Sequence, residues 1–248
     1  MDEFLIENDR TWHPFYRLLC DIERCLDNGI YMPALGMALT IPDICGKVVY
    51  PKCKVSKFSY IAWYDEFQGH YDMYGRNPGL YDAHDAYLRS LHTAYEAFCD
   101  FGKKKQLLEV ENALSWPKSY CNNKFFGIFG DAVYALRCSF LHAGGASDYD
   151  KRYSFDFMFG EVLCNGKLCT CDLIEEVSCD DIRCHMNIDR LCKCLIRNGL
   201  AFFLDNFDAF SDMKFDVRPF WVEYWRIGIN PPGGTLHKLF TLCDEDAE

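Results

Sequence analysis

The hydrophobic pattern of this 248-residue chain changes its period at the glycine pair Gly144-Gly145. Before this pair, apolar residues recur every three or four positions, which is typical of helices that bury one face. After it, residues 151–163 (KRYSFDFMFGEVL) alternate aromatic side chains with polar or smaller ones, the period of a β-strand. Asn165-Gly166 then provides a two-residue hairpin turn, and KLCTCDLIEEV follows it. The sequence therefore predicts a mainly α protein with one inserted β-hairpin at about residues 153–176.

The remaining helical segments predict a bundle of five or more long elements. Pro42 cannot donate a backbone hydrogen bond, so we expect a kink or a break at Thr40-Ile41. We expect one helical domain over residues 1–248, ending in an acidic tail (DEDAE) without fixed structure. The predicted helices cover residues 12–28, 31–50, 57–72, 80–101, a segment that begins near Asn122 or after Gly130 and ends before Gly144, and 180–207.

The net charge restricts the function classes that are open to the chain. It carries 26 basic and 37 acidic residues, a formal charge of −11. Proteins that coat nucleic acid depend on Lys and Arg contacts to phosphates, so this balance argues against a general DNA or RNA coat. It remains compatible with a nuclease that has a small local basic pocket.

Cysteine use and hydropathy bear on the compartment. The chain has 15 cysteines, and its N-terminus, MDEFLIENDR, is acidic and lacks the apolar segment of a signal peptide. No apolar run approaches the ~20 residues that a membrane span requires. We therefore expect a cytoplasmic protein with no membrane contact and with reduced cysteines that act as small buried hydrophobes.

Residues 131–145 (DAVYALRCSFLHAGG) contain the two side chains on which the functional prediction depends. Arg137 places a permanent charge in an apolar run, and His142 can exchange a proton near neutral pH. On an ideal helix the two lie about 140° apart, at ~100° per residue. They can converge if His142 lies in a frayed last turn, or if a second copy of the helix is juxtaposed.

The Arg-x4-His spacing and the wider string YALRCSFLHAG resemble the catalytic helix of the HEPN superfamily, small helical domains found in many RNA-cleaving toxins and phage-defence nucleases. The segments MALTIPDICG (37–46) and YIAWYDEF (60–67) are similar to parts of an uncharacterised bacterial family with the same Arg/His helix. The resemblance implies a HEPN-like helical bundle and an endoribonuclease that needs neither metal nor cofactor. It further implies a homodimer whose two copies of the helix form one composite site. Many HEPN members have Asn, Asp or His directly after the Arg, whereas this chain has Cys138.

Cleavage of RNA by its own 2′-hydroxyl defines a role for each residue. His142 is suited to the proton transfers, and Arg137 to a bidentate contact with the phosphate. Ser139 and Tyr134 flank Arg137 as candidate substrate-binding helpers. Lys103 and Lys104, in the basic run of residues 103–105, are candidates for phosphate contact. RNA is the expected partner, together with a neutralising or activating protein.

Several alternatives remain open from sequence alone. Asp43 is either a first-turn carboxylate or a polar site residue. Asp65-Glu66, with His70 and Asp72, is either a solvated acidic face or a set of metal ligands, with the solvated face favoured. The cysteines of residues 164–184 and His185 are either strand thiols or a zinc site. Finally, the chain is either the ribonuclease or a non-catalytic helical module that uses Arg137 as a buried anchor and His142 as a cap.

Overall fold

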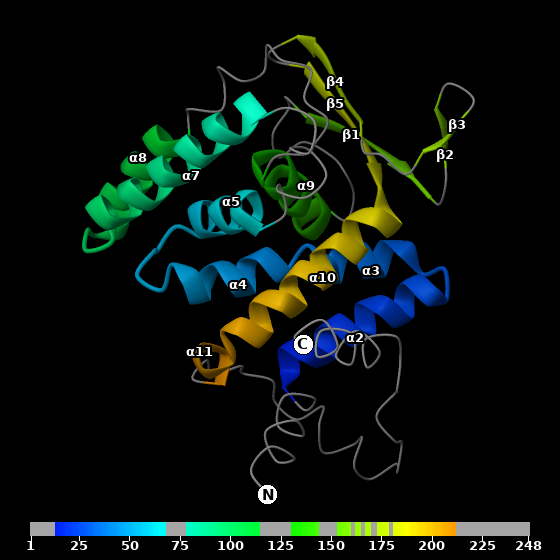
Figure 1. The fold of residues 1–248 in the computed structure, drawn as a ribbon, viewed down its shortest axis with the longest axis horizontal. Helices are drawn as coiled ribbons and strands as arrows, with labels where there is room; N and C mark the ends of the chain where they lie inside the picture. The colour runs from blue at the N-terminus through cyan, green and yellow to red at the C-terminus, as the bar shows by residue number, and fades with distance from the viewer. Residues whose placement is uncertain are drawn as a thin grey trace, which may run out of the picture.

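The computed structural model describes residues 13–67, 78–114, 130–143, 153–159, 162–164, 167–169, 173–178 and 181–211, and it is mainly helical, as predicted (Figure 1). The acidic tail, residues 220–225, His70 and Asp72 lie outside this part of the chain. The helices are α2 (Pro14–Asp27), α3 (Tyr31–Ala38), α4 (Ile41–Val49), α5 (Ser56–Phe67), α7 (Pro78–Phe98), α8 (Lys103–Leu114), α9 (Gly130–Ala143), α10 (Ile188–Asp205) and α11 (Phe207–Ser211). The strands are β1 (Tyr153–Met158), β2 (Val162–Cys164), β3 (Lys167–Cys169), β4 (Leu173–Ser178) and β5 (Asp181–Asn187).

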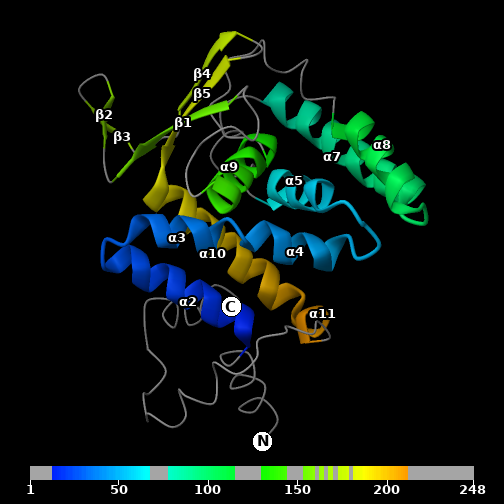
Figure 2. The same cartoon turned by 180° about the vertical axis from the view of Figure 1, so that it is seen from behind.

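Helices α2, α3, α4 and α10 pack against one another. Helices α3 and α4 run end to end and α10 crosses them, as the front and back views both show (Figures 1 and 2). The predicted interruption at Thr40-Ile41 is confirmed, because α3 ends at Ala38 and α4 begins at Ile41. Helix α2 starts at His13, whose Nδ1 accepts a hydrogen bond from the Phe15 amide at 3.1 Å.

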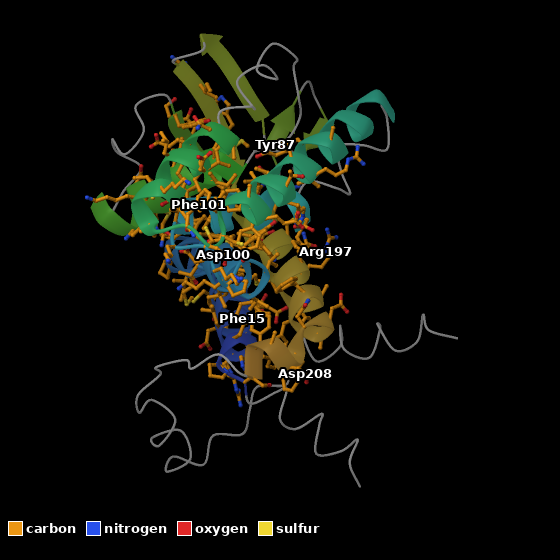
Figure 3. All side chains as sticks on the ribbon, turned by 90° about the vertical axis from the view of Figure 1, so that its left-hand side faces the viewer. Phe15, Tyr87, Asp100, Phe101, Arg197 and Asp208 are labelled. Atoms are coloured by element: carbon orange, nitrogen blue, oxygen red, sulfur yellow. The ribbon has the colours of Figure 1, made fainter. Side chains whose placement is uncertain are left out.

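Aromatic rings pack against one another where α2 meets α11. Phe15 and Asp208 mark this end of the molecule in Figure 3. The ring of Phe15 lies 4.9 Å from that of Phe210 and 5.7 Å from that of Phe203. The heavy use of phenylalanine in the sequence thus corresponds to direct ring packing between elements.

Helix α5 lies between two hydrophobic cores, and residues 58–65 are buried all round the helix. Phe58 and Ala62 belong to a smaller core with α7 and α8, whereas Ile61 and Trp63 belong to the main core with α9 and α10. A helix that is apolar and buried all round contacts other elements of the fold on every side. Helix α5 therefore connects the α7–α8 pair to the rest of the fold.

The β region differs in part from the prediction. The tight pairing is confirmed, because β2 runs antiparallel to β3 with Cys164 opposite Lys167. The two longer strands, however, do not pair with each other. Strand β1 runs parallel to β5, and β4 runs antiparallel to β5, so that β5 is the centre of a three-stranded sheet. The 153–176 region is thus a mixed sheet with a short hairpin rather than one long hairpin.

The central strand was predicted as helix. Residues 180–207 were expected to form one helix, but Asp181–Asn187 is strand β5 and α10 begins only at Ile188. Ile182, Cys184 and Met186 are buried while Arg183 between them is exposed. Burial thus alternates with the period of two that is typical of a strand. The helix was predicted because the same apolar positions, counted together with those of α10, also fit the spacing of a helical stripe. Asn187 marks the change, because its side chain accepts a hydrogen bond from the Arg190 amide at 3.1 Å and caps α10.

The expectation that no apolar run approaches the length of a membrane span is wrong: residues Tyr31–Val49 form one stretch, in the described part of the chain, that is long and apolar enough to cross a membrane. Helices in the cores of folded domains pass the same test. Here the stretch is divided between α3 and α4, and these helices pack on α2, α5 and α10.

Candidate active site on helix α9

Helix α9 is one continuous helix from Gly130 to Ala143, so it contains both Arg137 and His142, as the sequence predicted. Its first turn is fixed by the carboxylate of Asp65 on α5, whose Oδ1 accepts a hydrogen bond from the Gly130 amide at 2.7 Å. A Cβ at Gly130 would lie 2.9 Å from the Ile61 carbonyl oxygen, so this close approach of α9 to α5 requires glycine. The Tyr153 hydroxyl donates to Asp131 and ties the same turn to the sheet.

Asp65 is therefore neither solvated nor a metal ligand in this arrangement. Its side chain is buried, and its second oxygen accepts a hydrogen bond from the Tyr87 hydroxyl on α7 at 3.0 Å. Burial raises the pKa of Asp65 to about 7, and the hydrogen bond from Gly130 opposes that rise. The expectation of a solvated acidic face is therefore wrong for Asp65. The sequence did not reveal this burial, because the hydrogen-bond partners of Asp65 lie 22 and 65 positions away.

Arg137 pairs with Asp43, which lies in the first turn of α4. Its Nε donates to Oδ2 of Asp43 at 2.7 Å, and its Nη2 lies 2.6 Å from the same oxygen. The side chains are 20% and 13% exposed, so the pair is largely buried but still open to solvent. Both alternatives for Asp43 are thus realised in one residue, since it occupies the first turn and also contacts the candidate site.

The ion pair keeps Arg137 charged. Burial lowers the pKa of Arg137, but the Asp43 carboxylate more than offsets this, and the pKa is raised overall. Burial raises the pKa of the Asp43 carboxyl, and the Arg137 guanidinium opposes that rise. Nη1 points to the Cys138 thiol at 3.8 Å, a weak contact, so one edge of the guanidinium has no oxygen partner among the residues that the structure describes.

Two tyrosine rings complete the surroundings of Arg137. Its guanidinium carbon lies 5.7 Å from the ring centre of Tyr134 and 6.0 Å from that of Tyr60. The two rings meet edge to face at 5.3 Å. The Tyr60 hydroxyl is buried without a hydrogen-bond partner in the described residues, and burial raises the pKa of Tyr60 well above its ordinary value. The sequence placed Asp43 and Tyr60 in segments similar to a bacterial family, but it did not predict that they lie beside Arg137.

Of the other predicted site residues, Tyr134 lies beside Arg137, whereas Lys103 and Lys104 lie on α8. Ser139 and Tyr134 are 3% and 7% exposed, so both side chains are largely buried in this chain, and their helper role stays a prediction. Lys103 and Lys104 are exposed on α8, which packs on α7. They form the start of this helix. The backbone of His142 lies in the last turn of α9, and its side chain is outside the described part of the structure.

No group of three or more His, Cys, Asp or Glu side chains in the described residues could hold a metal ion. Cys184 faces the main core on the same side of β5 as Ile182 and Met186, which is the strand-thiol alternative. Cys171 and Cys179 lie outside the described residues.

No family model matches this sequence, and searches of curated proteins and of solved structures find no match.

Proposed function

We propose that this chain is a metal-independent endoribonuclease of toxin or phage-defence type, with Arg137 and His142 of α9 as its catalytic residues. The observation that supports this most directly is the geometry of Arg137. A single carboxylate oxygen holds one edge of its guanidinium, while the other edge has no oxygen partner among the described residues and the side chain retains 20% exposure. An arginine that is oriented by protein but not fully satisfied is suited to receive a phosphate.

The proposed reaction needs only the groups of the RNA and of the protein. The 2′-oxygen attacks the adjacent phosphorus as an imidazole accepts its proton, and the bond from phosphorus to the 5′-oxygen breaks as that oxygen receives a proton. The products are a 2′,3′-cyclic phosphate and a free 5′-hydroxyl. Arg137 stabilises the negative charge of the pentacoordinate phosphate.

A second copy of the chain supplies the missing proton-transfer group. One chain contributes one His142, whereas base and acid are both required, so a two-fold axis near the last turns of α9 would bring two histidines to one phosphate. We further propose that the protein works in the cytoplasm and that its activity is set by a neutralising or activating protein, as expected for a toxin.

The test is incubation of the pure protein with total RNA in the presence of EDTA. The wild type is expected to cleave, and His142→Ala is expected to lower the rate by at least about 100-fold, the usual contribution of a general acid or base. His92→Ala is a matched control, because His92 is an exposed helix histidine on α7 whose ring contacts Glu66 and Tyr50. Equal activity of His142→Ala and wild type would refute the proposal.

The Arg137 variant must respect the ion pair. Arg137→Ala alone leaves the carboxylate of Asp43 largely buried without a counter-charge, so loss of activity could follow from loss of the fold. Arg137→Gln combined with Asp43→Asn replaces the charged pair by a neutral, hydrogen-bonding one. We expect this double variant to stay folded and to lose cleavage.

The second candidate is a non-catalytic helical module, and the Asp43–Arg137 pair is the observation that favours it. An ion pair that joins α4 to α9 is sufficient reason for an arginine at this position. In that case the variant with Arg137→Gln and Asp43→Asn would keep its partner binding, and no preparation of the wild type would cleave RNA.

A further inference from the structure

Five exposed lysines gather at one end of the α7–α8 pair, on a chain whose overall charge is −11. We call them the lysine face. Lys52 and Lys54 lie in the connection between α4 and α5, and Lys103, Lys104 and Lys105 form the first turn of α8. The two segments are about 50 residues apart in the sequence, and the fold brings them together.

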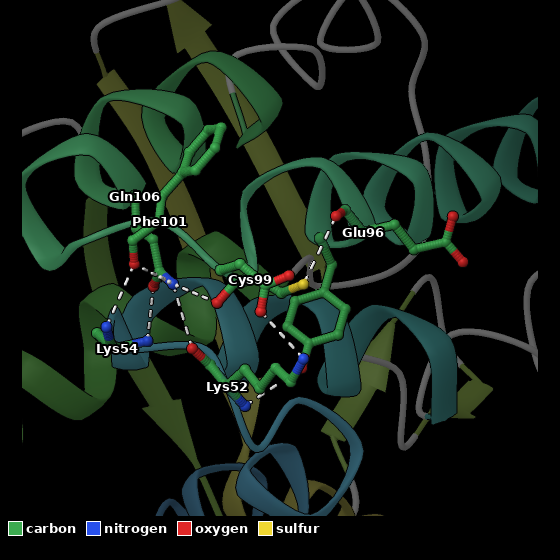
Figure 4. Close-up of polar contacts among 8 residues, drawn as sticks. Lys52, Lys54, Glu96, Cys99, Phe101 and Gln106 are labelled. Atoms are coloured by element: carbon green, nitrogen blue, oxygen red, sulfur yellow. Dashed lines mark hydrogen bonds and ion pairs between the residues drawn. The ribbon is translucent and has the colours of Figure 1, made fainter.

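Gln106 holds the two segments in place (Figure 4). Its side chain is fully buried, and its Oε1 accepts a hydrogen bond from the Lys54 amide at 2.8 Å. Its Nε2 donates to the carbonyl oxygens of Lys52 at 3.2 Å, Cys99 at 3.1 Å and Phe101 at 3.2 Å. A buried amide with four partners fixes the backbone that presents the lysines.

Phe101 and Asp100 bring the ammonium groups close to one another. Lys54 Nζ donates to the Phe101 carbonyl at 3.3 Å, and Lys105 Nζ lies 3.5 Å from the centre of the Phe101 ring. Lys52 Nζ pairs with Asp100 at 3.0 Å, which neutralises one of the five charges. Lys103 and Lys104 have no acidic residue in the first turn of α8, where the helix dipole adds further positive potential.

We propose that the lysine face binds the phosphate backbone of single-stranded RNA and delivers it to the α9 site. The choice of RNA among polyanions rests on the proposed function; the binding of a polyanion rests on the lysines themselves. Fixed ammonium groups beside a helix N-terminus are the usual donors to phosphate oxygens, and they contact the backbone without reading its sequence.

Helix α4 separates the lysine face from Arg137 by a short length of chain. It carries Asp43 in its first turn and ends at Val49, three residues before Lys52. The distance along the helix axis from Asp43 to Val49 is about 9 Å at ~1.5 Å per residue. In our proposal, one RNA strand spans this separation.

A membrane surface is the competing partner, because Leu107 and Leu108 are exposed at 50% and 60% directly after the lysines. A helix that lies in a membrane interface needs a continuous apolar face. In α8 the buried side carries Gln106 and Val110, and the exposed side continues with Glu111 and Asn112, so the two leucines form no such face. The contacts on this surface therefore favour RNA.

The test measures binding of a fluorescein-labelled, mixed-sequence single-stranded RNA by anisotropy in EDTA. The full chain carries His142→Ala, so that binding is measured without cleavage. Lys103→Glu with Lys104→Glu is expected to weaken binding at least about tenfold at low salt and to make its salt dependence shallower. Lys193→Glu with Arg197→Glu, two exposed cations on α10, makes the same change in net charge and is expected to alter affinity by less than about twofold.

Each outcome bears on the proposal. Equal affinities of the two double variants, or no RNA binding by their parent, overturn it. Binding to anionic phosphatidylserine vesicles is measured for the same variants. If Lys103→Glu with Lys104→Glu loses vesicle binding but keeps RNA binding, the lysine face binds membranes and the proposal is overturned. If the lysine variant loses RNA binding while the wild type fails to cleave RNA, the face stands and the proposed catalytic function fails. If the wild type cleaves RNA but the lysine variant binds RNA as tightly as its parent does, the proposed catalytic function stands and the role of the lysine face fails.

Discussion

At the scale of single residues, two carboxylates hold α9 in place. Asp65 fixes the start of the helix and Asp43 holds Arg137. The sequence identified Arg137 as a charged residue in an apolar helix, but its counter-charge is 94 positions away. No local pattern reports a contact at that separation, and Asp43 also fits an ordinary first-turn position, which is why its second role could not be predicted.

The Asp43–Arg137 pair is expected to stabilise the fold as a unit. Asp43→Ala should lower the free energy of unfolding by about 2–4 kcal/mol, because it leaves a largely buried guanidinium without its counter-charge. Asp43→Leu with Arg137→Met should restore most of this loss, since apolar side chains of similar size need no counter-charge. Urea unfolding of the wild type, Asp43→Leu, Arg137→Met and the double variant gives the coupling free energy. Simple additivity of the two single losses would contradict this account of the pair.

Asp65 is expected to make stability depend on pH. Its pKa is about 7 in the folded chain against an ordinary value of 3.8, so the unfolded chain releases this proton at lower pH than the folded one does. The free energy of unfolding should therefore fall as the pH rises from about 4 to about 7 and then level off, by up to about 4 kcal/mol at ~1.4 kcal/mol per pKa unit. Asp65→Asn keeps a carbonyl acceptor for Gly130 and removes the titration. The check is urea unfolding at pH 5 and pH 8, and an identical slope in Asp65→Asn would assign the effect to other groups.

At the scale of elements, most of the long helices followed from the sequence, but α8 was not predicted, and the sheet followed only in part. The apolar spacing placed α2, α5, α7 and α9 within a few residues of their observed ends, and Pro42 located the break between α3 and α4. Strand β5 could not be separated from α10 by apolar spacing, because Ile182 and Met186 are four residues apart and fit both periods. The parallel pairing of β1 with β5 depends on tertiary packing rather than on any local signal.

The contact between α4 and α5 is expected to tolerate no added atom at Gly46. A Cβ there would lie 2.4 Å from the Ser59 carbonyl oxygen and 2.8 Å from its carbon, and backbone atoms of a buried helix cannot move aside cheaply. Gly46→Ala should lower the free energy of unfolding by about 2–3 kcal/mol. Gly102→Ala is the control, because nothing lies within 4 Å of a Cβ at that position. Thermal unfolding of the two variants compares them directly, and equal stability would show that α4 and α5 are less closely packed than described.

At the scale of the whole molecule, α5 unites two cores, and α9 packs on α5 at the main core. The lysine face lies at the smaller core, on the α7–α8 pair, and the Arg137 pair lies at the main core. In the function that we propose, the arrangement separates the surface that would bind RNA from the site that would cleave it. The sequence predicted the helical bundle and the two chemically distinctive residues of α9; the placement of the lysines relative to them required the fold.

The central claim is that Arg137 and His142 act together across two copies of the chain, and a mixing experiment tests it most directly. His142→Ala alone is expected to be inactive on RNA in EDTA. When the wild type is unfolded with a large excess of His142→Ala and the two are refolded together, nearly every wild-type chain pairs with a variant chain, and the mixed dimer holds only one of the two required histidines. We therefore expect cleavage per wild-type chain to fall by at least about 100-fold. Mixed dimers that form and leave cleavage per wild-type chain unchanged would contradict a shared site.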